Sequence, residues 1–105
     1  MDKSSPDIPT DALIADIATL RNVIDGIDEK ILDLINQRLL LAKQIGGLKK
    51  KAGIQITDSA RENEITRRLL NINRGPLSDD GLNNIFAAII TEGRKIQKKI
   101  ENKND

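Results

Sequence analysis

A single apolar stripe in the first half of the chain limits what the chain can fold into. Its residues recur at alternating steps of three and four, which is the heptad pattern of one face of a long helix. The nine members, called the heptad stripe below, are Ile17, Leu20, Ile24, Ile27, Ile31, Leu34, Leu41, Ile45 and Leu48. They predict one helix that runs without interruption through this half of the sequence.

One place in the heptad stripe is charged, because Arg38 stands between Leu34 and Leu41. A guanidinium group stays ionised at any ordinary pH, and burying it without an anionic partner costs several kcal/mol or more. Arg38 must therefore meet an anion. A structural ion pair with a carboxylate of another helix and an anionic ligand are both open at this point.

The predicted helix is too long for a compact domain of this size. No proline occurs between Thr10 and Lys51, so about 40 residues can form roughly 60 Å of helix. A compact domain of about 100 residues has a radius of gyration of about 13 Å. The heptad stripe must be covered by something else, and a second copy of the chain is the economical partner.

The rest of the chain predicts two shorter helices. A connector around Gly53 precedes the second helix, which can begin with a capping box of Ser59 and Glu62 and should end at Gly75 in a left-handed conformation. Ser78 is expected to cap the third helix, whose apolar residues again recur at steps of three and four.

These elements predict an all-α fold with three helices per chain, the first much the longest. We expect residues 1–9 to be a disordered tail, residues 10–101 to form one domain and residues 102–105 to fray. Two chains that pair along their first helices would form an intertwined six-helix homodimer.

Composition excludes several classes of function. The net charge is +1, with 17 basic and 16 acidic residues interspersed, and Phe86 is the only aromatic residue, so no surface typical of nucleic-acid or membrane binding is indicated. The absence of Cys and His rules out disulfides, thiol catalysis, His-dependent triads and the usual zinc sites. No apolar run could span a membrane or serve as a signal-peptide core, so we expect a cytoplasmic protein without a metal or cofactor.

Three cationic side chains could share a ligand. Arg38 and Lys49 are eleven residues apart on one helix face, about 16 Å along the axis, so both can reach one small anion between them. Arg21 lies a further seventeen residues back, roughly 25 Å from Arg38, and can approach the same ligand only from the other chain of an antiparallel dimer. For Arg21 or Lys49 alone, a solvated flank position is the simpler interpretation.

The remaining candidates have structural explanations too. Asp58 and Glu62 could serve only as helix caps, Gln97 could be a solvated amide, and Gly93 could permit close helix packing. No single residue decides between these interpretations. The candidates from the second and third helices are Asp58, Arg61, Glu62, Gly93 and Gln97.

Taken together, these residues resemble the all-helical (AroQ-type) chorismate mutases from about Leu20 to Ile100. The segment LRNVIDGIDEKILDLINQRLLLAKQIGGLKK is similar to the family's long first helix, including Arg38 and Lys49. ITDSARENEI matches its Asp-x-x-Arg-Glu signature, and IFAAIITEGRKIQ matches its third helix, with Gln97 at the family's glutamine or glutamate position.

The resemblance implies the Claisen rearrangement of chorismate to prephenate, a step toward phenylalanine and tyrosine, in a homodimer. By the family's pattern, Arg38 and the partner's Arg21 clamp the two substrate carboxylates, and Lys49 and Gln97 donate hydrogen bonds to the ether oxygen. Glu62, assisted by Asp58, holds the ring hydroxyl, and Arg61 supports the site. Many members have Ser at the position of Gly93, which predicts weaker binding here.

Two alternatives stay open. An isochorismate pyruvate lyase shares this fold and the Arg and Lys clamp, although Asp58, Arg61 and Glu62 favour the mutase. A non-catalytic helical dimerisation module would explain the heptad stripe, but neither Arg38 within it nor the combination of Gln97 and Glu62.

Overall fold

A computed structural model describes residues 7–103 of the chain, and the described part is all-helical with no strand. It divides into two units, one ending at Leu34 and the other beginning at Ile35. The predicted all-α class with three helices is confirmed. Most of the expected tail, residues 1–6, and the last two residues, 104–105, lie outside the described residues.

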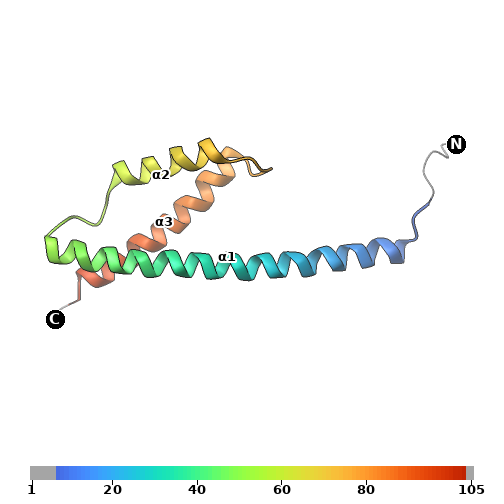
Figure 1. Cartoon of the computed structure of the whole chain (residues 1–105), viewed down its shortest axis with the longest axis horizontal. Helices are drawn as coiled ribbons and strands as arrows, with labels where there is room; N and C mark the ends of the chain where they lie inside the picture. The colour runs from blue at the N-terminus through green and yellow to red at the C-terminus, as the bar shows by residue number, and fades with distance from the viewer. Residues whose placement is uncertain (1–6, 104–105) are drawn as a thin grey trace. The chain divides into compact units, whose positions relative to one another are not determined.

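The first helix, α1, spans Thr10–Ala52 and contributes to both units (Figure 1). It ends where Gly53 takes a φ of +69°, a left-handed conformation that glycine adopts without steric cost. The amide of Ile54 then donates to the Lys49 carbonyl at 2.9 Å, which satisfies one of the last carbonyls of the helix. This local chemistry turns the chain into the connector at the predicted place.

The second helix, α2, spans Ser59–Ile72 and begins differently from the expected capping box. Asp58 is its N-cap, with its carboxylate accepting a hydrogen bond from the Arg61 amide at 2.9 Å, so Ser59 is already the first helical residue. The prediction of Ser59 as the cap was wrong by one residue. An aspartate is preferred at this position because its short carboxylate reaches a free amide and its charge faces the positive helix end.

The end of α2 also differs from the expectation. Gly75 does not have a positive φ, and the C-cap Asn73 is extended, with φ −65° and ψ 120°. The side chain of Asn73 stabilises this turn: its Oδ1 accepts from the Gly75 amide at 3.2 Å and its Nδ2 donates to the Leu77 carbonyl at 2.8 Å. An amide side chain that bonds to the local backbone replaces the left-handed glycine.

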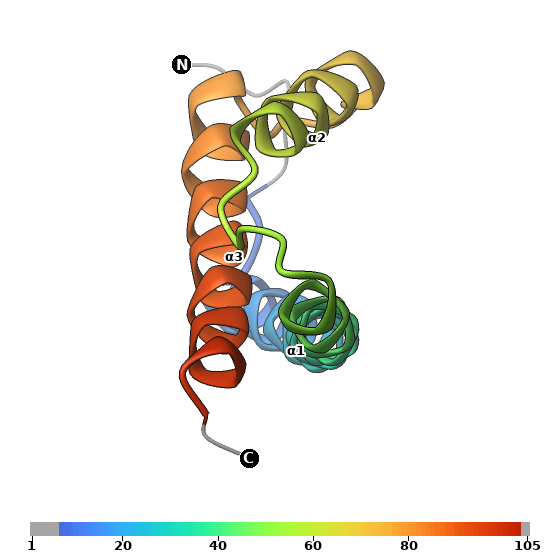
Figure 2. The same cartoon turned by 90° about the vertical axis from the view of Figure 1, so that its left-hand side faces the viewer.

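The third helix, α3, spans Asp79–Glu101 and begins as predicted at Ser78, whose hydroxyl accepts from the Gly81 amide at 2.9 Å. In the second unit α3 packs against α2 and also approaches the C-terminal part of α1 (Figure 2). The buried apolar side chains of this unit are few: Ala42, Ile56, Ile65 and Leu82.

The heptad stripe is left open to solvent in the single chain. Each of its nine residues keeps between 47% and 64% of its surface exposed. Packing normally removes apolar side chains in this number from water. Each Å² of apolar surface that is buried stabilises the folded state by about 25 cal/mol. The chain's own described residues do not cover the surface that the heptad pattern predicted would be covered.

Among the described residues, no helix is both long enough and apolar enough to cross a membrane.

Candidate active site

The second unit contains a pocket of about 280 Å³ whose wall is built from all three helices and the connector. The pocket is lined by both polar and apolar residues. The polar and glycine positions are Arg38, Lys49, Asp58, Arg61, Glu62, Gly93, Arg94 and Gln97, and the apolar ones are Leu41, Ala42, Ile45, Ile56, Ile65 and Ile90.

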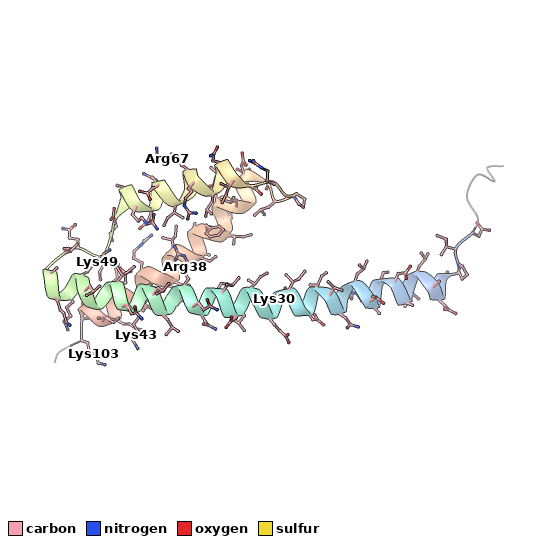
Figure 3. All side chains as sticks on the ribbon, in the orientation of Figure 1. Lys30, Arg38, Lys43, Lys49, Arg67 and Lys103 are labelled. Carbon is pink, nitrogen blue, oxygen red and sulfur yellow. The ribbon has the colours of Figure 1, made fainter. Side chains whose placement is uncertain are left out.

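The C-terminal part of α1 provides two cations to the wall. Arg38 and Lys49 point from α1 toward the side on which α2 lies, while Lys43 lies on the other side of the helix (Figure 3). This follows from the helical repeat, because eleven residues return almost to the same face and five do not. Within residues 7–103, neither Arg38 nor Lys49 has a carboxylate at ion-pair distance.

Lys49 also fastens the connector to α1. Its Nζ donates a hydrogen bond of 2.9 Å to the carbonyl of Ile56, a residue that is 8% exposed. A lysine ammonium group has three donors, so this bond leaves others that can turn to a ligand. This hydrogen bond therefore positions both the connector and the Lys49 ammonium group at the edge of the pocket.

The first turn of α2 provides the carboxylates. The cap formed by Asp58 fixes the start of the helix, and the Glu62 amide donates to the Asp58 carbonyl at 3.0 Å. Glu62 is half-buried on the pocket wall, whereas Arg61 turns to Glu64, with 2.6 Å between its Nη1 and the carboxylate. Arg61 thus bonds to Asp58 through its backbone amide and to Glu64 through its side chain.

The wall formed by α3 carries Gly93 and Gln97. A Cβ added at Gly93 would lie 3.6 Å from the Ala42 Cβ and 3.7 Å from Arg38 Nη1, which are ordinary contact distances. A Cβ would therefore fit at this position, beside the arginine. The glycine is not required there by close packing, so this structural explanation for Gly93 is wrong.

Close packing does apply to Gly46 on α1, directly against Gln97. A Cβ at Gly46 would come within 3.0 Å of Gln97 Cγ and 3.1 Å of its Cα, which is closer than side chains normally approach. At the neighbouring Gly47, an added Cβ would meet no atom of residues 7–103 within 4 Å. Gly46 therefore lets α3 bring Gln97 to the pocket wall.

This difference predicts opposite effects for two adjacent substitutions. Gly47→Ala should raise the free energy of unfolding by up to about 1 kcal/mol, because alanine is the better helix former. Gly46→Ala should lower it, since the Gln97 backbone would have to move. Chemical denaturation of both variants measures the contrast, and equal stabilisation by the two alanines would contradict the close approach.

Arg94 is a residue of the pocket wall that was not predicted from the sequence. Its Nη2 donates to Glu62 Oε1 at 3.0 Å, and its Nε is buried without a hydrogen-bond partner among the described residues. A signal was present, because Arg94 precedes Gln97 by three residues and so shares its helix face. With Arg94 included, four cations and two carboxylates line the pocket, so the lining side chains carry a net charge of +2.

The structure brings seven of the eight predicted residues to this one pocket. The eighth, Arg21, is exposed and belongs to the first unit. No group of three or more Asp and Glu residues in the described part of the chain is arranged to hold a metal ion. The wall suits an organic anion that also carries an O–H or N–H group, because the Glu62 carboxylate can accept a hydrogen bond from that group.

Comparison with known proteins agrees with this chemistry. The chain is 35% identical over 97 residues to a chorismate mutase of Methanocaldococcus jannaschii, covering 88% of this chain and 98% of that protein. It is 39% identical over 90 residues to a bifunctional chorismate mutase/prephenate dehydratase of Aquifex aeolicus, covering 82% of this chain and 25% of that protein. A protein of the same description from Neisseria gonorrhoeae is 34% identical over 80 residues, which are 76% of this chain and 22% of that protein.

The chain thus spans about a quarter of the two bifunctional relatives and nearly all of the M. jannaschii protein. The family described as chorismate mutase type II matches residues 20–98, which contain the whole pocket wall together with Arg21. This chain belongs to the chorismate mutase type II family.

Proposed function

We propose that the chain is an isomerase that converts chorismate to prephenate in the cytoplasm, as a homodimer and without a cofactor. The observation that carries the proposal is the pair of cations on the pocket wall, Arg38 and Lys49, which lack a carboxylate partner among residues 7–103. A dianionic substrate would supply the negative charges that pair with these two cations. The net charge of +2 on the lining side chains matches that substrate.

The reaction is a pericyclic rearrangement, so it requires no nucleophile. The enzyme must hold the substrate in a compact conformation and stabilise the negative charge that gathers on the breaking ether oxygen. Lys49 and Gln97 donate hydrogen bonds to that oxygen, and the Arg38 guanidinium binds a carboxylate through two parallel hydrogen bonds. Glu62 accepts a hydrogen bond from the ring hydroxyl, with Asp58 and Arg61 maintaining the helix start that carries it.

Arg21 of the partner subunit completes the carboxylate clamp. The exposed heptad stripe supports this arrangement, because a second chain that covers the stripe also brings its own first helix near the pocket. The Arg21 guanidinium then serves the substrate's other carboxylate.

Incubation of the purified protein with chorismate, followed by identification of the product, tests the function. We expect prephenate at a rate far above the uncatalysed rearrangement, and little or no product from isochorismate. Pyruvate and salicylate from isochorismate would indicate the lyase instead. If neither substrate gives a product, the result would favour a non-catalytic helical dimerisation module.

The dimer is tested by sedimentation. We expect about twice the chain mass of 11.6 kDa at micromolar concentration, because a monomer would leave the heptad stripe in water. Ile24→Lys, within the stripe, should weaken the dimer strongly, whereas the matched control Asn22→Lys, outside the stripe, should not. A parent protein that sediments as a folded, active monomer would refute the dimer.

A further inference from the structure

Arg94 forms an ion pair that differs from its neighbours on the surface. It joins α3 to α2 through Glu62, with side chains that are 33% and 29% exposed. The pairs Arg61–Glu64 and Lys95–Glu92 each lie within one helix, and their side chains are 54% to 62% exposed. Only the Arg94 pair of these three has both members on the pocket wall.

Stability alone is a poor reason for an arginine at this position. Exposed ion pairs contribute little to the free energy of unfolding. A partly buried pair stabilises the fold only if its attraction exceeds the cost of removing both charges from water. The Arg94 Nε is buried without an acceptor in the part of the chain that the structure describes, which adds to that cost. An apolar side chain on this face of α3 would avoid both penalties, so the position of the guanidinium calls for a role at the pocket.

The geometry of the pair suggests that role. Arg94 binds Oε1 of Glu62, and the second carboxylate oxygen remains available to accept a hydrogen bond. A free glutamate would lose side-chain entropy when it orders around a ligand, and a carboxylate already held by another group loses less. The positive charge of Arg94 also offsets the repulsion between Glu62 and an anionic ligand.

We propose that Arg94 is a positioning residue for the rearrangement. It holds the Glu62 carboxylate so that the free oxygen faces the substrate's ring hydroxyl, and it compensates the Glu62 charge beside a dianion. Arg94 acts through Glu62 and does not itself contact the reacting atoms. This inference rests on the proposed mutase function.

A double-mutant cycle measures whether Arg94 acts through Glu62. The proteins compared are the parent, Arg94→Gln, Glu62→Ala and the double variant, with kcat and KM measured on chorismate. We expect Arg94→Gln to lower kcat/KM tenfold or more in the parent and by less than twofold in the Glu62→Ala background. Arg94→Lys should recover part of the loss, and the matched control Lys95→Gln should retain the parent's activity.

Each other outcome overturns the inference. An equal loss in both backgrounds, accompanied by a lower melting temperature, would make Arg94 a structural residue only, and an unchanged kcat/KM would remove any role. If Arg94→Gln fails to fold, the same cycle is run with Arg94→Lys. An active parent with an additive cycle defeats this inference alone, whereas a parent inactive on chorismate defeats the proposed function and the inference together.

Discussion

Lys49→Ala should lower kcat by a hundredfold or more while KM changes much less. This corresponds to about 3 kcal/mol of transition-state stabilisation, the scale of one lost donor to a developing oxyanion. The expectation rests on the position of Lys49 at the pocket edge, where the connector carbonyl of Ile56 holds its ammonium group. Steady-state kinetics on chorismate measures the effect.

The control for Lys49→Ala is the neighbouring lysine. Lys50→Ala removes the same charge from the same turn of α1, but Lys50 donates to the Lys103 carbonyl and does not line this pocket. Its activity should stay within about twofold of the parent's, since a charge outside the pocket is screened by solvent and salt. If the two alanine variants turn over chorismate equally well, Lys49 has no role in the rearrangement.

Mixing two inactive variants should restore activity. Arg21→Ala and Arg38→Ala are each expected to disable the carboxylate clamp, and a mixed dimer contains one pocket with both arginines intact. After complete subunit exchange of equal amounts, about a quarter of all pockets are intact, so about a quarter of the parent's activity should return. The measurement is turnover before and after exchange, with exchange followed independently by mass spectrometry.

A second mixture serves as the matched control. Arg38 and Lys49 line the pocket of one chain, so a mixed dimer of Arg38→Ala and Lys49→Ala contains no intact pocket and should stay inactive. Recovery in both mixtures would mean that the clamp is not shared as proposed. Recovery in neither, with exchange demonstrated, would assign Arg21 and Arg38 to the same chain's site.

The sequence by itself determined the helices and most of the pocket wall. The heptad stripe predicted α1, and Ser78 marked the start of α3, because helical periodicity and caps depend on residues only a few positions apart. The spacing of Arg38 and Lys49 placed both on one face for the same reason. Two caps differ from the prediction: Asp58 rather than Ser59 is the N-cap of α2, and an extended Asn73 rather than a left-handed Gly75 is its C-cap.

Contacts between helices were decided only by the tertiary structure. Gly46 and Gly47 are adjacent and identical in sequence, yet only Gly46 faces Gln97, because the crossing of α1 and α3 selects one of the two. Arg94 meets Glu62 across 32 positions of sequence, and no local pattern relates residues so far apart. Helical periodicity shows which residues share a face, but the packing of one helix on another determines which side chains meet.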